Sequence, residues 1–174
     1  MIDGRDSDER AARRAQAHAF IDAVLDVDPA TAAGPALTNA IESHAQLAAI
    51  IDGAVVGIIP QWEASADWAR DGSRSPVVTM VNRTGAPRSA AAALRRTGLL
   101  AASMPHVSAA AATGALPLSH LRLLTRARRD DVADVFDRDE QMLATEAQTL
   151  TADALEQRLV AWRWGALEEL ERND

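Results

Sequence analysis

The spacing of apolar residues constrains the fold of this chain more than any other feature of the sequence. Apolar residues recur three and four positions apart, and the longest such series is Leu37, Ile41, His44, Leu47, Ile51, Val55 and Ile58. This spacing predicts a long amphipathic helix that ends at Pro60 and lies at the centre of the core. No segment alternates apolar and polar residues over the length of a strand.

Composition supports the same fold class. The chain has 174 residues, enough for one domain with a buried core, and it is rich in alanine and lacks tyrosine. We therefore predict an all-α protein, a single helical domain of about eight helices that contains a helix-turn-helix with long amphipathic helices on either side. Residues 1–35 are expected to form an N-terminal helix and linker, and residues 36–174 the helical domain.

The C-terminal third contains further helix signals. Asp137 and Thr151 are residue types that cap helices, which predicts that two helices begin beside them. An apolar stripe follows Thr151 and predicts the buried face of the last helix; it consists of Leu155, Leu159, Trp162, Ala166 and Leu170.

A pair of shorter helices is predicted at residues 76–97. Ser75 before Pro76 is a typical helix start, and Gly85 supplies the backbone freedom with which a helix can end. Pro87 then opens a second helix, so the connection is only a few residues long. This is the geometry of a helix-turn-helix whose second helix is the recognition helix, although such pairs also occur as plain structural corners.

Positive charge is concentrated around this pair of helices. Residues 70–129 contain ten arginines and one acid, a net charge of +9, whereas the remaining residues sum to −16 and the whole chain to −7. A concentrated basic segment is typical of a surface that meets phosphates. The alternative is that these arginines pair with acidic helices elsewhere in the chain.

Particular residues of the basic segment are candidate contacts to double-stranded DNA. Arg88 and Ser89 begin the recognition helix and are predicted to reach base edges, with Ala92 allowing close approach. The predicted phosphate contacts are Arg95, Arg96, Arg83, Arg122 and Arg126. If these arginines share one open surface, DNA binding is favoured; if an acidic helix covers them, a structural role is favoured.

The sequence contains no arrangement that predicts catalysis or a cofactor. Cysteine is absent, and the four histidines are scattered. Six acids between residues 130 and 140 raise the alternative of a metal-binding nuclease remnant, but capping and solvated roles are favoured because no general base accompanies them. We expect no metal site, no cofactor and no enzymatic activity. The four tryptophans lie outside the basic segment and are expected in the core or an interface.

Short motifs along residues 37–163 resemble a known family. They are Trp68-Ala69-Arg70-Asp71-Gly72, Thr84-Gly85, Leu94-Arg95, Leu100 with Met104-Pro105, Gly114-Ala115-Leu116, His120, and Asp139-Glu140 before Leu143, Ala147, Leu150 and Trp162. In order and spacing they resemble the actinobacterial domain of unknown function 222, which usually precedes an HNH endonuclease module. The resemblance implies a DNA-recognition or targeting part of such a protein, here without the nuclease motif.

The segment from the Thr-Gly turn to His120 also resembles, more distantly, the helix-turn-helix of ParB-type partition proteins. Two positions depart from these patterns. Pro117 stands where a serine-like cap is common, and Gly98 is expected to weaken the end of the recognition helix by about 1 kcal/mol relative to alanine.

The chain is predicted to be cytoplasmic and without a membrane span, because it opens on polar residues and its longest apolar run, residues 54–60, is too short to cross a bilayer.

A competing hypothesis is a non-catalytic interaction scaffold that uses the helix at residues 37–59 and the Trp-bearing C-terminal helix. A homodimer formed through that C-terminal helix is the partner expected under this alternative. The negative charge outside the basic segment suits protein contacts.

Overall fold

A computed structural model describes residues 4–173, and over this range the protein is all-α with no strand. Its elements, in chain order, are α1 (Gly4–Leu25), α2 (Gly34–Ala64), the 3-10 turn η1 (Asp67–Ala69), α3 (Pro76–Thr84), α4 (Arg88–Ala101), α5 (Pro105–Ala112), α6 (Leu118–Ala127), the 3-10 turn η2 (Asp130–Val132), α7 (Ala133–Ala147) and α8 (Ala152–Asn173). The prediction of an all-α fold with about eight helices is confirmed. The predicted division between residues 35 and 36 falls in the first turn of α2.

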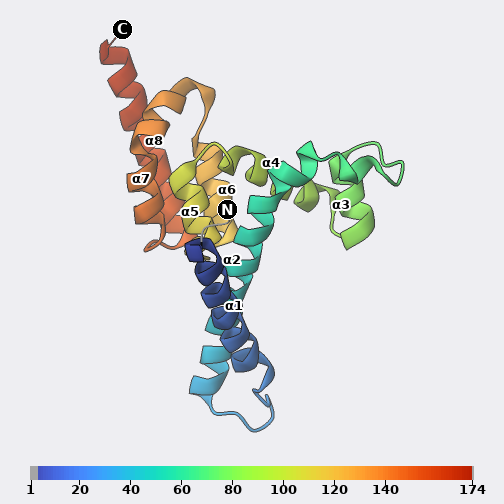
Figure 1. The fold of residues 1–174 in the computed structure, drawn as a ribbon. Helices are drawn as coiled ribbons and strands as arrows, with labels where there is room; N and C mark the ends of the chain where they lie inside the picture. The colour runs from blue at the N-terminus through green and yellow to red at the C-terminus, as the bar shows by residue number, and fades with distance from the viewer. Residues whose placement is uncertain (1–3, 174) are drawn as a thin grey trace.

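Helix α2 connects three parts of the molecule (Figure 1). With α1 it forms a helical hairpin that projects from the body, and its C-terminal half packs against α4 and α5. Helix α3 lies at the end of a lateral arm, where it packs on α4 and η1. The remaining helices, α5 to α8, form the body of the protein.

The hydrophobic core lies in this body. Its largest fully buried side chains are Phe136, Met104, Leu116, Leu121, Leu124, Leu143, Leu155, Val107 and Val132. Trp162 of α8 packs edge-on against Phe136, with ring centroids 5.5 Å apart. The predicted stripe of α8 is confirmed, because Leu155, Leu159, Trp162 and Ala166 are buried and Leu170 packs against the same core.

The predicted buried stripe of α2 is wrong. Ile41, Ile51 and Ile58 are 72%, 51% and 58% exposed, whereas the buried residues of this helix are Ser43, Ala49, Ile50, Gly53, Val56 and Ile59. The helix is apolar on more than one face, and the face with small residues is the one that α4 and α5 cover. Periodicity alone does not distinguish two apolar faces of one helix.

Close helix packing explains this choice of face. A Cβ atom added at Gly53 would lie 1.9 Å from the carbonyl oxygen of Ala111 in α5, and one added at Gly98 would lie 2.8 Å from Cβ of Ile59. Glycine therefore lets α5 and α4 approach α2 at these positions. Gly98 lowers the helix propensity of α4, as expected, but it also allows α4 to pack closely on Ile59 of α2, which was not predicted.

Two predicted helix boundaries are wrong. Helix α2 does not end at Pro60 but continues to Ala64, with the proline inside its last turns. Asp137 does not cap a helix, because it lies within α7 and its carboxylate accepts two hydrogen bonds from Arg128, at 2.7 and 2.8 Å. Thr151 is confirmed as a cap, since its hydroxyl accepts a hydrogen bond from the amide of Ala154 at 3.3 Å.

Candidate nucleic-acid interface

The turn between α3 and α4 is built by local capping. Ser75 Oγ accepts a hydrogen bond from the amide of Val78, and Pro76 occupies the first helical position, as predicted. Gly85 ends α3 in the left-handed conformation, with φ of 69°, which confirms its predicted role. Helix α4 begins at Arg88 and Pro87 is its N-cap residue, one position later than expected.

Few contacts hold α3 in place. The hydroxyl of Thr79 donates a hydrogen bond to the backbone oxygen of Trp68 at 2.8 Å, which ties the helix to η1. Arg83, at the C-terminal end of α3, forms an exposed ion pair with Asp71 at 3.1 Å. These contacts fix α3 beside the loop that precedes it and leave its C-terminal end at the surface.

The first turn of α4 is open to solvent. Arg88, Ser89 and Ala90 are exposed, and so is Arg96 two turns later. Within the part of the chain that the structure describes, the guanidinium groups of Arg88 and Arg96 have no ion pair or hydrogen bond. Both are therefore available to an anion outside the chain. Ala92 and Ala93 lie half-buried between them.

Arg95 is engaged with α2 instead. Its guanidinium donates two hydrogen bonds to the carboxylate of Glu63, one of them from Nε to Oε2 at 2.7 Å. The ion pair is partly buried, with side-chain exposures of 33% for Arg95 and 23% for Glu63. The hydrogen bonds to Glu63 raise the pKa of Arg95 above its usual value. Arg95 consequently joins α4 to α2 in this structure.

Arg122 of α6 also faces the protein. Its side chain is half-buried, and its Nε is enclosed without a hydrogen-bond partner among the described residues. Asp52 of α2 lies near enough to feel its charge: burial raises the pKa of Asp52, and the positive charge of Arg122 opposes that rise. Arg122 thus serves the packing of α6 against α2.

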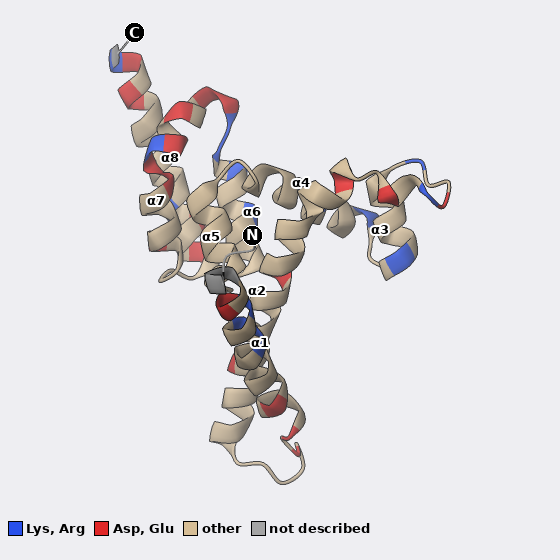
Figure 2. Cartoon of the chain, viewed as in Figure 1, with Lys and Arg blue, Asp and Glu red and all other residues tan. Residues whose placement is uncertain are grey.

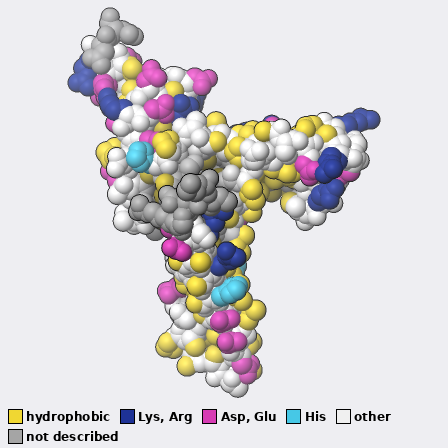
Figure 3. Space-filling view, in the orientation of Figure 1, with side chains coloured by type: hydrophobic (Ala, Val, Ile, Leu, Met, Phe, Trp, Pro, Cys, Tyr) yellow, Lys and Arg dark blue, Asp and Glu magenta, His cyan; other side chains and the backbone are white. Residues whose placement is uncertain are grey.

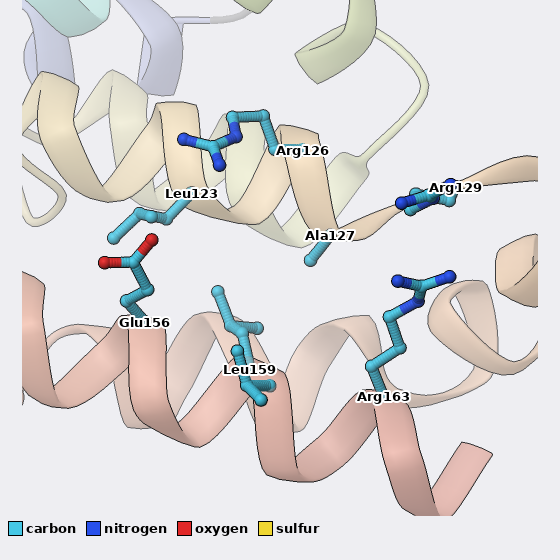
Figure 4. A pocket seen from close by; sticks show the side chains of 8 residues that line it. Leu123, Arg126, Ala127, Arg129, Glu156, Leu159 and Arg163 are labelled. Carbon is cyan, nitrogen blue, oxygen red and sulfur yellow. The ribbon is translucent and has the colours of Figure 1, made fainter. Parts of the chain in front are cut away.

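Arg126 lies in a groove between α6 and α8 (Figure 4). The groove has a volume of about 420 Å³, and its lining residues are Leu123, Arg126, Ala127, Arg129, Glu156, Leu159, Val160 and Arg163. Arg163 is paired with Asp131 at 2.6 Å, whereas the exposed Arg126 has no ion partner within residues 4–173.

The seven predicted contact residues therefore divide into two groups. Arg83, Arg88, Ser89 and Arg96 are exposed on α3 and α4. Arg95 and Arg122 face α2, and Arg126 lines the groove beside α8. Figure 2 shows both basic and acidic residues on the arm that carries the first group.

Arg74 is a further candidate contact that was not predicted from the sequence. It is exposed in the loop before α3 and has no ion pair in the described range. Its membership of the basic segment is the signal that could have identified it. Nothing in the sequence could have paired Arg95 with Glu63, because 32 positions separate them.

The acidic run at residues 130–140 has structural partners. Asp131, Asp137 and Asp139 pair with Arg163, Arg128 and Arg138. Glu140 is buried, and its carboxylate accepts a hydrogen bond from the amide of Val107 at 2.9 Å, where it caps α5. Over residues 4–173, no group of three or more metal-ligating side chains is assembled.

The remaining candidate residues are divided between core and surface. His120 is buried, and its Nε2 lies 2.9 Å from the backbone oxygen of Leu150. Trp162 belongs to the core and donates a hydrogen bond to Asp139, whereas Trp164 on the same helix is 66% exposed. Trp62 and Trp68 are half-buried near the junction of α2 and the arm.

Comparison with protein-family models, with curated proteins and with solved structures gave no match. The fold thus defines an all-α protein, and its resemblance to the domain found ahead of HNH nucleases stays a prediction.

Among residues 4–173, α2 alone is long and apolar enough to cross a membrane by length and composition. Core helices of water-soluble proteins meet the same criterion.

Proposed function

We propose that this chain is a double-stranded-DNA-binding module in which residues 76–97 act as a helix-turn-helix. The observation that carries the proposal is the exposed start of α4: Arg88 and Ser89 stand open to solvent directly after the glycine turn. The first residues of a recognition helix are those that contact base edges in the major groove.

The charge around this turn supports the proposal. Residues 67–96 contain six arginines and two acids, and the chain as a whole is acidic. Arg83, Arg96 and Arg74 would contact phosphates on either side of the recognition helix. Arg88 and Ser89 would contact base edges and so provide any preference for a DNA sequence. Arg95 and Arg122 would act as braces that fix α4 and α6 to α2.

The resemblance to the domain ahead of HNH nucleases suggests the biological setting. In this proposal the chain is a non-catalytic targeting module in the cytoplasm, without a cofactor, and the nuclease chemistry resides elsewhere. Binding to phosphates releases counterions condensed on the DNA, and added salt reduces the free energy gained from that release, so affinity is expected to fall strongly as ionic strength rises.

Fluorescence anisotropy with labelled random duplex DNA tests the proposal. The logarithm of the affinity should fall linearly with the logarithm of salt concentration, and the slope should decrease by about one for each phosphate contact removed. The Arg88→Ala/Arg96→Ala variant should bind more weakly with a smaller slope. Arg172→Ala, which removes an exposed arginine from α8, is the matched control and should bind as the wild type does. Absence of binding at low salt, or binding that the double variant leaves unchanged, would refute the proposal.

A second candidate function is a protein-interaction scaffold. The observation that favours it is the exposure of large apolar side chains on α2 and α8, among them Ile51, Ile58 and Trp164. Apolar rows of this kind mark interaction surfaces. This function is compatible with DNA binding, because the exposed start of α4 lies on a different element.

A further inference from the structure

An apolar groove runs between α1 and α2. Its volume is about 400 Å³, and its floor and sides are formed mainly by Ala17, Ile50, Ile51, Ala54, Val55 and Ile58. Ile51 and Ile58 stand two helical turns apart on one face of α2, so they form a continuous exposed row. Hydrophobic side chains are visible along this hairpin in Figure 3, interspersed with charged ones.

The rim of the groove is basic. Arg13 and Arg14 of α1 line it, and neither has an acidic partner among the residues whose side chains the structure describes. An apolar floor beside unpaired guanidinium groups fits an amphipathic helix that carries acids next to its apolar residues.

Helix α8 of the same chain presents such a surface. Val160 and Trp164 are 55% and 66% exposed and lie one turn apart on α8, with Val160 at the edge of the groove beside α6. Glu156 and Glu168 continue the same row by one turn at each end, and both are exposed. We call these four residues the α8 ridge.

The α8 ridge is not occupied by the hairpin of its own chain. Helix α8 packs on α6, α7 and η2, whereas α1 packs on α2. The hairpin and the C-terminal half of α8 project from different sides of the body (Figure 1). A contact between the two surfaces therefore needs a second molecule.

We propose that the α8 ridge of one copy of this chain docks in the α1–α2 groove of a second copy. Trp164 and Val160 would cover Ile51 and Ile58, and Glu156 and Glu168 would approach the Arg13–Arg14 rim. Apolar contact supplies the attraction, and the opposite charges set the orientation. A homodimer through the Trp-bearing helix α8 was expected from the sequence, and this proposal names the α1–α2 groove as the surface that α8 contacts. It does not depend on DNA binding.

Sedimentation velocity over a wide range of protein concentration tests the contact. The wild type should associate reversibly, and Ile51→Asp and Trp164→Asp should each weaken association by at least about tenfold. Met142→Asp is the matched control, because Met142 is 42% exposed on α7 and outside both surfaces. All three side chains are exposed, so circular dichroism should report unchanged helix content.

A mixing experiment distinguishes this contact from general stickiness. The Ile51→Asp variant retains its α8 ridge, and the Trp164→Asp variant retains its groove, so a mixture should associate more tightly than either variant alone. Likewise, Arg13→Glu/Arg14→Glu should weaken association, and adding Glu156→Arg/Glu168→Arg to the same chain should restore it.

Three results would overturn the proposal. They are a wild type that stays monomeric at every concentration, association that these variants leave unchanged, and a mixture no tighter than its components. Binding of a monomeric wild type to anionic lipid vesicles, lost in Ile51→Asp, would assign the groove to a membrane surface instead. Duplex binding is measured separately by anisotropy. Absence of self-association would therefore not refute DNA binding, and absence of DNA binding would not refute self-association.

Discussion

At the residue scale, folding partly offsets the segregation of charge along the sequence. Arginines of the basic segment, residues 70–129, are paired with acids outside it, as in the pairs Arg95–Glu63 and Arg128–Asp137. The pairs Arg138–Glu169, Arg158–Glu146 and Arg163–Asp131 join residues that lie outside that segment. Arginine suits such pairs because its planar guanidinium can bind both oxygens of a carboxylate. The exposed, unpaired Arg88 and Arg96 stand out against this background.

The ion pair between Arg95 and Glu63 yields a stability prediction. Because the pair is partly buried and doubly hydrogen-bonded, Glu63→Gln should lower the free energy of unfolding by about 1–2 kcal/mol, as measured by urea denaturation. The matched control is Asp67→Asn, which alters the exposed pair with Arg70 and should change stability very little. Equal losses in the two variants would contradict the bracing role of Arg95.

The carboxyl groups of α7 yield a prediction about pH. Hydrogen bonds from Arg138, with a further one from Trp162, hold the pKa of Asp139 below its ordinary value, and Arg128 does the same for Asp137. A depressed native-state pKa stabilises the fold fully above the unfolded-state pKa of about 3.9, and this stability is lost as pH falls through the native value.

The wild type should therefore lose stability steadily below about pH 4. The Asp139→Asn/Asp137→Asn variant should be less stable at neutral pH and show a flatter decline in acid. Urea unfolding at a series of pH values measures both curves. Parallel curves for the two proteins would show that these carboxyl groups are not linked to folding.

At the element scale, glycine determines where helices cross. Gly53 and Gly57 both lie in α2, one turn apart, but their surroundings differ: an added Cβ at Gly53 would meet the backbone of Ala111, whereas nothing lies within 4 Å of one at Gly57. Ile50, Gly53 and Val56 thus form the face that α5 covers, and the larger side chains Ile51 and Ile58 point elsewhere.

This contrast provides a matched pair of substitutions. Gly53→Ala should destabilise the protein by about 3 kcal/mol or more, because backbone cannot move aside without shifting α5. Gly57→Ala should stabilise it by roughly 0.5–1 kcal/mol through its higher helix propensity. Thermal and urea unfolding measure both changes. A Gly53→Ala variant as stable as the wild type would mean that α5 does not approach α2 this closely.

At the scale of the whole molecule, the protein is a compact body with projecting parts. Helix α1 packs on α2 alone among the major contacts, and α3 packs on α4 and η1, whereas the body encloses the fully buried side chains. The projecting helices include those that we propose bind DNA, at α3 and the start of α4, and the α1–α2 hairpin that we propose receives a second copy of the chain. Surfaces that bind partners are commonly the least tightly packed parts of a protein.

Hydrogen exchange measured by mass spectrometry tests this division. Amides of α1 and α3 should exchange faster than those of α6 and α7 and of α8 near Trp162, because opening the projecting helices exposes little core. In the self-associated state, protection should rise in α1 and in α8 around Trp164. Uniform protection of all helices in the monomer would argue against the division into body and projections.

Features that depend on neighbouring residues could be predicted from the sequence alone. The caps at Ser75, Gly85 and Thr151 and the buried stripe of α8 follow from local hydrogen bonding and helical period, which act within a few positions. The all-α class follows from the same period.

Contacts between distant segments set which apolar face of α2 is buried and which arginines are paired. The burial of Ile50 rather than Ile51 depends on the space that Gly53 leaves for α5, and the position of Arg95 depends on Glu63, far away in the chain. Both are contacts between distant segments, whose geometry no local pattern specifies. For the same reason, four of the seven predicted contact residues are exposed on one arm and three are placed elsewhere.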